Sequence, residues 1–423
     1  EHIFIANYIN NGDSNWHKLL NNKNKELEFE QLDFDDPLYI MYSSGTTGKP
    51  KSIVHSVGGT LIQHLKEHLL HVDLKKNSKI FYFTTCGWMM WNWLVSSLSI
   101  GCSIVLFDGN PFYPNNDSLL KIMNKIDIDV FGTSAKYIST LEEKNVKPDL
   151  FKFKSLKTIL STGSTLNGSS YDYVYKYWKK DIQLSSISGG TDIISCFALG
   201  NPNLPVFKNE LQCIGLGMSV KSFDCNMLPK LNKKGELVCD KPFPSMPVGF
   251  WNDIENKKYI KAYFSYFPNI WRHGDFIEIN NHGGVIIYGR SDATLNPGGV
   301  RIGTSEIYQV LEKNKIVLDS VAIGYMIDED EKIILFVKLD NNFLLDDQLI
   351  FKIKKLIKEN CSPRHVPEFI IQVKEIPYTV NGKKVEIAVR NIIHNIEVSN
   401  KEALVNPDCL KEYKLKVKEM LYG

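Results

Sequence analysis

The sequence carries almost no net charge. Its 50 lysines and arginines nearly balance its 48 aspartates and glutamates, which leaves a formal net charge of +2 over 423 residues. That balance argues against a broad surface for nucleic acid or anionic lipid. The sequence also lacks a run of about 18 apolar residues, the length that a transmembrane helix needs. We therefore expect neither a nucleic-acid partner nor membrane insertion.

Closely paired cysteines are absent as well. The chain has eight cysteines at irregular spacing and no C-x-x-C pair. Such cysteines are typical of reduced thiols in a cytosolic enzyme. The sequence thus predicts a cytoplasmic protein without a disulfide framework.

The chain also lacks an initiator methionine. It begins at Glu1, and its first forty residues combine a short apolar run with a polar stretch rich in Asn and Lys. Neither a signal peptide nor a transit peptide fits this pattern. We expect that an N-terminal part of the protein is missing.

What is present is the composition of a globular protein, with 43% hydrophobic and 23% charged residues. Short β-rich runs alternate with helical patterns such as Thr60–Val72 and Leu119–Ile126, which predicts an α/β fold of layered sheets and helices. The expected strands are 79–85, 103–108, 129–133, 156–161 and 182–188.

Two changes of pattern divide the rest of the chain. From Leu211 to Tyr288 short strands with Gly and Pro dominate, which indicates a β-rich subdomain. After Gly289–Val300 comes a compact α+β pattern. We expect a large domain over 1–290 and a small hinged domain over 291–423. In the small domain we expect helices at 304–313 and 346–359 and strands at 320–326, 332–339 and 368–375.

The segment Ser43–Lys51 reads Ser-Ser-Gly-Thr-Thr-Gly-Lys-Pro-Lys and follows the apolar run Leu38–Tyr42. Glycines let backbone N–H groups approach phosphate oxygens, hydroxyls donate hydrogen bonds, and lysines supply positive charge. The loop therefore predicts a polyphosphate site. It is not a Walker A loop, because that pattern requires a second glycine where this chain has Pro50.

Five segments resemble, in order, the motifs of the adenylate-forming superfamily, which holds acyl-CoA synthetases, peptide-synthetase adenylation domains and luciferases. The segments are Ser43–Lys51, Ser188–Asp192, Trp271–Asp275, Tyr288–Asp292 and Pro377–Lys383. The resemblance covers nearly the whole chain. It implies a large domain followed by a small mobile domain, with the hinge at Asp292.

Three details resemble the acetoacetyl-CoA synthetase family within that superfamily: Cys86–Trp93, Ser188–Cys196 and Tyr378–Glu386. This resemblance implies an AMP-forming ligase that converts acetoacetate, ATP and CoA to acetoacetyl-CoA, AMP and pyrophosphate through an acyl-adenylate. It also implies Mg²⁺ as cofactor. A ligase for another short or branched acid, or an inactive adenylate-binding fragment, remains an alternative.

The resemblance assigns a role to each motif. Thr191 contacts phosphate, Asp192 holds Mg²⁺, and Asp275 grips the ribose hydroxyls. Lys383 is the catalytic cation that bridges the carboxylate and the α-phosphate, where two anions must be brought together. Asp192 is one methylene shorter than the Glu common elsewhere in the superfamily, so we expect the metal to shift or to bind through water.

The resemblance implies further contacts along the chain. The catalytic set is Lys383, Thr191 and Asp192. The expected ATP and AMP contacts are Ser43, Ser44, Gly45, Thr46, Thr47, Gly48, Lys49, Gly163, Ser164, Thr165, Ser188, Gly189, Gly190, Asp275, Arg290 and Arg301. The expected CoA contacts are Gly298 and Gly299.

The acyl pocket is expected to be lined by Trp88, Met89, Met90, Thr162 and Gly189. Acetate-specific relatives carry a Trp at the position of Gly189. Loss of an indole, which buries roughly 150–250 Å², is expected to open room for a longer acid.

Three histidines, His64, His68 and His71, fall on one side of the predicted helix Thr60–Val72. They could form a metal-binding face. We favour the polar face of an amphipathic helix, because neither a carboxylate nor a Cys joins the stripe and the opposite face is apolar.

Overall fold

The computed structural model describes residues 26, 28–43, 51–291, 295–297, 302–312, 314–327, 330–379, 382–398 and 401–422. The chain divides into two compact units, Glu1–Asp33 and Phe34–Gly423. All the elements below belong to the second unit. Within the described ranges, every helix is too short or too polar to span a bilayer.

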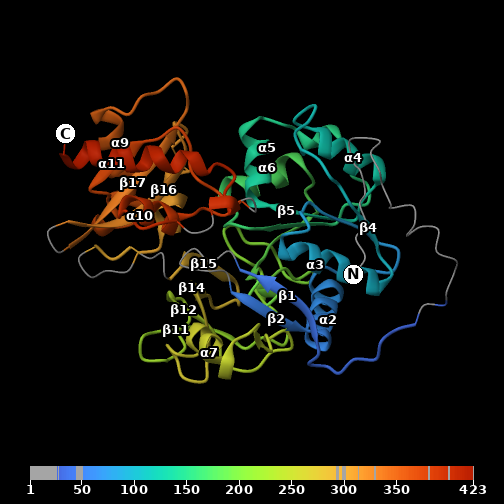
Figure 1. Cartoon of the computed structure of the whole chain (residues 1–423). Helices are drawn as coiled ribbons and strands as arrows, with labels where there is room; N and C mark the ends of the chain where they lie inside the picture. The colour runs from blue at the N-terminus through green and yellow to red at the C-terminus, as the bar shows by residue number, and fades with distance from the viewer. Residues whose placement is uncertain are drawn as a thin grey trace, which may run out of the picture. The chain divides into compact units, whose positions relative to one another are not determined.

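A parallel sheet of five strands organises the first part of this unit (Figure 1). Its strands lie in the order β4-β3-β5-β6-β7, and all neighbouring pairs are parallel. Their bounds are β3 Lys79–Tyr82, β4 Ser103–Val105, β5 Val130–Ser134, β6 Thr158–Thr162 and β7 Gln183–Ser186. Each overlaps one of the five strands expected from the sequence, so the α/β interpretation is confirmed.

Side chains alternate between the two faces of this sheet, as the pleat of a strand requires. Phe81 and Phe131 join the core formed with the helices α4, α5 and α6. Ile80 and Val130 join the opposite core, which contains Trp93 of α3. The helices are α3 Met89–Ser96, α4 Ser118–Ile126, α5 Ala135–Glu143 and α6 Gly168–Tyr177. Both faces are therefore covered, which explains why β3, β5, β6 and β7 are mostly buried.

The helix α2 (Val57–Lys66) and the π-helix η1 (Glu67–His71) correct one expectation. Ser56 caps α2 by accepting a hydrogen bond from the Gly59 amide. The polar side is the buried side, and it holds Gln63, His64, Glu67, His68 and His71. The exposed side carries the apolar residues Leu61, Ile62, Leu69 and Leu70. The prediction that the histidines form a solvated face is therefore wrong.

Hydrogen bonds to backbone carbonyls explain why the polar side of α2 and η1 is the buried side. His64 Nε2 lies 2.5 Å from the Ile194 carbonyl, and His68 Nε2 lies 2.9 Å from the Trp93 carbonyl. His71 Nδ1 lies 2.7 Å from the Gly200 carbonyl. Each imidazole can therefore be buried without losing a partner for its donor. Among the described residues, no cluster of three or more potential metal ligands is found, so the metal-face alternative gains no support.

The β-rich subdomain expected over 211–288 is present. Its main sheet has the order β11-β12-β14-β15, and every neighbouring pair is antiparallel. The strands are β11 Val220–Phe223, β12 Gly235–Cys239, β14 Trp271–Ile279 and β15 Val285–Arg290. The helix α7 (Lys257–Tyr263) packs its tyrosines with Trp271 in the same core. A smaller sheet beside it has the order β10-β9-β8, with β8 Ser188–Gly190, β9 Ser195–Leu199 and β10 Cys213–Ile214.

The last part of the chain forms a three-stranded sheet, β16-β17-β18, surrounded by helices (Figure 1). Its elements are α8 Thr304–Leu311, β16 Val317–Ile327, β17 Asp330–Leu339, α9 Asp347–Asn360, β18 Phe369–Gln372, α10 Glu386–Ile393 and α11 Leu410–Tyr422. The first five overlap the elements expected from the sequence, whereas α10 and α11 were not predicted. Two hydrophobic cores are built from residues after 294 alone.

Candidate active site

Part of the predicted site lies outside the described residues. This holds for the middle of the phosphate loop, for the hinge and for the CoA contacts: Ser44, Gly45, Thr46, Thr47, Gly48, Lys49, Asp292, Gly298, Gly299 and Arg301. The two ends of the phosphate loop are described. The Ser43 amide donates to the Lys51 carbonyl at 3.3 Å, at the open end of the antiparallel strands β1 (Pro37–Tyr42) and β2 (Ser52–Ser56). The two ends of the phosphate loop are therefore hydrogen-bonded to each other.

Lys51, Asp192 and Tyr263 meet although they are far apart in the sequence. Lys51 Nζ lies 2.9 Å from Asp192 Oδ1, and the Tyr263 hydroxyl donates to the same oxygen at 2.5 Å. The ammonium also lies 4.7 Å from the centre of the Tyr263 ring. Phosphate loop, metal motif and α7 are thus joined at a single carboxylate.

The charge state of Asp192 follows from these contacts. Burial alone would raise its pKa, but the Lys51 ammonium, His273 and the Tyr263 hydroxyl together hold the pKa of Asp192 well below its usual range. Burial and the Asp192 charge raise the pKa of Tyr263, so the phenol stays a donor. Asp192 is therefore ionised throughout the physiological range.

The backbone of the metal motif is held by a histidine from β2. His55 Nε2 lies 2.9 Å from the Thr191 carbonyl oxygen, to which it must donate. Burial lowers the pKa of His55 to about 4, although this hydrogen bond and Asp192 oppose the shift. A neutral His55 therefore positions Thr191 and Asp192 just after strand β8. Ser188, Gly189 and Gly190 form that strand.

Asp275 lies on β14 between two basic side chains. His273 Nε2 is 3.4 Å and Arg290 Nη1 is 3.8 Å from its carboxylate oxygens. Burial lowers the pKa of His273, while Asp275 and Asp192 oppose that shift. Because β14 and β15 pair at Asp275 and Arg290, the two residues leave adjacent strands at the same level. The sheet register thus brings together two residues that the sequence assigned to the ribose.

Lys383 lies in a tight turn of the last part of the chain. The Thr379 amide donates to the Lys383 carbonyl at 2.9 Å, and the Lys383 amide donates to the Thr379 hydroxyl at 3.1 Å. Gly382 has a φ of +74°, a conformation that favours glycine. A Cβ on Gly382 would lie 3.9 Å from side-chain atoms of Ser134 and Lys136, so the turn reaches the end of β5.

The Lys383 ammonium interacts electrostatically with charged groups of the site described above. Surrounding protein lowers its pKa, Asp192 and Asp275 oppose the shift, and Arg290 adds to it. The solvent-accessible surface of Lys383 nevertheless shows that this residue is exposed. Because the side chain is exposed and two carboxylates favour its charged form, Lys383 carries a positive charge. Three predicted motifs converge on this region.

The predicted adenine segment follows strand β6. Gly163 has a φ of +89°, which a residue with a side chain rarely adopts, and it turns the chain directly after Thr162. Ser164 is exposed, while Gly163 and Thr165 are half-buried. The segment thus lies at the carboxyl end of a parallel strand, where α/β sheets commonly bind ligands.

The predicted acyl pocket is only partly as expected. Met89 and Met90 are buried in the core below the sheet, with Trp88 packed against it. The Thr162 hydroxyl donates to the Ile187 carbonyl at 2.9 Å.

Gly189 is crowded on the side where a side chain would project. A Cβ there would lie 1.9 Å from the Ser195 carbonyl oxygen and 2.6 Å from Cys196 Cα. In this conformation the glycine permits close approach of β8 and β9, and it does not open space for an acid.

Sequence reasoning missed several residues of this region. Tyr263 and His55 carry no motif of their own, and only the fold brings them to Asp192 and Thr191. Lys51 and His273 were visible, since they lie inside the phosphate-loop and Trp271–Asp275 segments, but no role was assigned to them.

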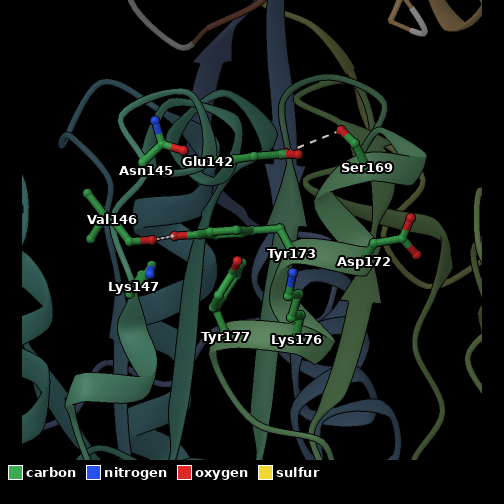
Figure 2. A pocket seen from close by; sticks show the side chains of 9 residues that line it. All are labelled: Glu142, Asn145, Val146, Lys147, Ser169, Asp172, Tyr173, Lys176 and Tyr177. Atoms are coloured by element: carbon green, nitrogen blue, oxygen red, sulfur yellow. Dashed lines mark hydrogen bonds between the residues drawn. The ribbon is translucent and has the colours of Figure 1, made fainter.

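A hollow on the described surface lies away from this region (Figure 2). It has a volume of about 310 Å³ and lies between α5 and α6, where Tyr173 donates to the Val146 carbonyl and Ser169 to Glu142. None of its lining residues belongs to the predicted site. The hollow therefore gives no support to the site, which rests on the contacts above.

Comparison with known proteins places the chain in a family. The model of the AMP-binding enzyme family matches residues 6–247. The chain belongs to that family.

Within that family the chain is similar to acetoacetyl-CoA synthetases. It is 51% identical over 391 residues to the protein of Gallus gallus and 52% identical over 385 residues to that of Rhizobium meliloti, covering 92% and 91% of this chain. In both cases the match covers 59% of the relative, so the chain spans about three fifths of these curated proteins.

Solved structures of related proteins also resemble this chain. The acetoacetyl-CoA synthetase from Streptomyces lividans superposes with a TM-score of 0.89 at 38% identity, covering 98% of this chain and 64% of that one. An anthranilate CoA ligase in complex with anthranoyl-AMP superposes with a TM-score of 0.78 at 19% identity, covering 92% and 72%. The second match shows the shared fold alone.

Proposed function

We propose that this chain is an AMP-forming acid–thiol ligase that converts acetoacetate, ATP and CoA to acetoacetyl-CoA, AMP and pyrophosphate. The observation that carries the proposal is the convergence of Lys383, Asp192 and Asp275, which come from three separate motifs. Sequence identity of 51% and 52% to two acetoacetyl-CoA synthetases supports the choice of acetoacetate as the acid.

The first half-reaction joins two anions. A carboxylate oxygen of the acid attacks the α-phosphorus of ATP, the bond to the bridging oxygen breaks, and pyrophosphate leaves. The Lys383 ammonium would lie between the carboxylate and the α-phosphate and reduce their repulsion. Its tight turn, closed by the Thr379 hydrogen bonds, limits where that ammonium can go.

The second half-reaction transfers the acyl group. The CoA sulfur attacks the acyl carbon, the bond to the phosphate oxygen breaks, and AMP leaves with that electron pair while the thiol proton passes to solvent. Gly298 and Gly299 are proposed to contact the CoA arm.

A magnesium ion is part of the proposal, and Asp192 suits it. Mg²⁺ usually takes one or two carboxylates together with substrate phosphates. Asp192 supplies one ionised carboxylate in a region without a larger ligand cluster among the described residues. When bound, the ion would neutralise charge on the phosphates. Thr191, held by His55, would offer its hydroxyl to the same phosphates.

Nucleotide binding is proposed to use the remaining predicted residues. Asp275 offers two acceptor oxygens to the ribose diol, and Arg290 beside it supplies a donor with fixed geometry. Ser43, with the loop that follows it, would bind the phosphates, and Gly163–Thr165 the adenine.

The domain boundary at 290/291 is also a proposal. It is supported by the two cores formed only by residues after 294, and by a sheet that shares no strand with the others. A small domain hinged near Asp292 would let the Lys383 turn approach for the first half-reaction and withdraw for the second.

Acid-dependent exchange of radiolabelled pyrophosphate into ATP tests this function. The panel is acetate, propionate, butyrate, 3-hydroxybutyrate and acetoacetate. We expect acetoacetate to give the highest kcat/KM. Because Gly189 does not open space here, the choice of acid rests on similarity, and a strong preference for acetate would contradict it. Absence of exchange with every acid would contradict the ligase itself.

A further inference from the structure

One oxygen of Asp192 receives two different donors. The Tyr263 hydroxyl lies 2.5 Å and the Lys51 ammonium 2.9 Å from Oδ1. The described residues place no donor on Oδ2. That oxygen lies near Gly190, whose ideal Cβ position is 3.8 Å from it. As far as the described residues go, the carboxylate is therefore oriented through Oδ1 alone.

Tyr263 is the rigid donor of the two. Its ring is almost fully buried and stacks on Trp271, with centroids 3.8 Å apart and an angle of 13° between the planes. Phe250 and Tyr259 pack edge-on against it. A ring held in this way keeps its hydroxyl at one place, so the hydrogen bond costs little ordering entropy.

Lys51 is the exchangeable donor. Its side chain is 37% exposed, against 18% for Asp192. A lysine ion pair with this much solvent contact is weak, because water competes for the ammonium and the long stem loses entropy when it is held. Lys51 is also the last residue of the phosphate loop, so its ammonium can turn toward a bound triphosphate.

We propose that Tyr263 is a positioning residue that holds Asp192 for a divalent cation, and that Lys51 is the resident cation that leaves when the cation binds with nucleotide. The proposal rests on the function proposed above. Two cations in contact with one carboxylate repel each other strongly, so the exchange follows from charge. Tyr263 is neutral, so the incoming cation does not repel it and its hydrogen bond to Asp192 is kept.

The test measures Mn²⁺ binding directly, with Mn²⁺ in place of Mg²⁺. Electron paramagnetic resonance counts free Mn²⁺ in the presence and absence of a non-hydrolysable ATP analogue, using the 423-residue protein. The variants are Tyr263→Phe, which keeps the stacked ring, and Lys51→Met, which keeps most of the stem. The matched control is Tyr259→Phe, because Tyr259 lies in the same aromatic cluster but donates to the Pro247 carbonyl.

The two variants should shift Mn²⁺ affinity in opposite directions. Tyr263→Phe should weaken Mn²⁺ binding with the analogue by roughly tenfold or more, as loss of a partner that orients a metal ligand commonly does. Lys51→Met should strengthen Mn²⁺ binding without nucleotide by several-fold, because Asp192 loses its resident cation. Tyr259→Phe should match the wild type.

Kinetics provides a second readout for Tyr263. In the pyrophosphate exchange, Tyr263→Phe should raise the KM for Mg²⁺ and recover most of kcat at saturating Mg²⁺. Analogue binding in the presence of a chelator should be unchanged, which also shows that the variant is folded.

Equal Mn²⁺ affinity of Tyr263→Phe and wild type would overturn the positioning role, and weaker Mn²⁺ binding by Lys51→Met without nucleotide would overturn the exchange. Failure of the proposed function would look different: no acid would support exchange, while the order of Mn²⁺ affinities would stand.

Discussion

At the scale of single residues, the site is built from side chains whose charge is set by their neighbours. Asp192 stays ionised because Lys51, His273 and Tyr263 outweigh its burial. His55 is kept neutral because burial dominates. Burial also lowers the pKa of His273, while Asp275 and Asp192 oppose that shift. The result is a region with two carboxylates and several cationic side chains, which suits a reaction between anions.

Replacing Lys383 by Ala should abolish most of the adenylation step and spare the second step. We expect pyrophosphate exchange to fall by roughly 100-fold or more, because a preorganised cation is lost from the reacting anions. Thioester formation from chemically prepared acyl-adenylate should stay close to wild type. Lys374→Ala, at an exposed lysine of the same region, is the control. If both half-reactions of Lys383→Ala persist, the assigned role is wrong.

At the scale of elements, close contacts decide features that residue type alone does not. The strands β8 and β9 approach so closely that Gly189 has no room for a side chain, whereas its neighbour Gly190 has. His64 of α2 and His68 of η1 are buried because they form hydrogen bonds with the carbonyls of Ile194 and Trp93.

The two neighbouring glycines of β8 should respond differently to Ala. Gly189→Ala should lower the free energy of unfolding by about 2 kcal/mol, as a forced shift of packed backbone typically does. Gly190→Ala should change it by less than about 0.5 kcal/mol, since its nearest contact would be 3.7 Å away. Urea unfolding of both variants measures this. A stable Gly189→Ala that accepts larger acids would restore the open-pocket interpretation.

The buried histidines of α2 and η1 should make the protein sensitive to acid. Burial lowers the pKa of His64 to about 4 and that of His68 to about 3, from an ordinary value of 6.5. Their stabilising contribution is thus complete above pH 6.5 and is lost as the pH falls toward the folded-state values. At pH 5.5 each histidine should cost about 1.4 kcal/mol relative to pH 7.5.

His68→Gln isolates this contribution, because the amide can still donate to the Trp93 carbonyl but does not titrate. The loss of stability between pH 7.5 and 5.5 should be smaller in the variant by that amount. Buried Glu67, whose pKa is raised, works in the opposite direction but is common to both proteins. Parallel pH profiles of denaturation midpoints for wild type and His68→Gln would refute the assignment.

At the scale of the whole molecule, the Lys383 turn depends on a polar network in the last part of the chain. Asp319 accepts from Lys384 at 2.8 Å and from the Tyr378 hydroxyl at 2.7 Å, and the Lys384 ammonium lies over the Tyr308 ring. Burial would raise the pKa of Asp319, but the Lys384 charge lowers it. This network holds both ends of the turn that carries Lys383.

Asp319→Ala should destabilise the small domain by about 3 kcal/mol, because it leaves a mostly buried ammonium without its partner. All seven tryptophans precede residue 291. The far-UV circular dichroism transition should therefore shift while tryptophan fluorescence does not. Asp408→Ala removes the exposed pair with Lys411 and should have almost no effect. If both signals shift together, the proposed boundary at 290/291 does not separate two unfolding units.

Motif order along the chain indicated the family and the region of the site, because phosphate binding needs glycines, hydroxyls and lysines in a fixed local arrangement. The parallel strands and most of the small domain were also predictable, since buried strands and amphipathic helices leave periodic patterns. The roles of Gly189 and of the three histidines were not, because they depend on the atoms that face each residue across the fold.

The sequence by itself indicated the family, the order of most elements and, through the resemblance, Asp192, Asp275 and Lys383 as candidate site residues. Only the tertiary structure decided that Tyr263 and Lys51 share one oxygen of Asp192, that α2 buries its polar side, and that Gly189 is crowded. The physical reason is the same in each case. Hydrogen bonds and steric contacts between residues far apart in the chain leave no periodic or local signal in the sequence.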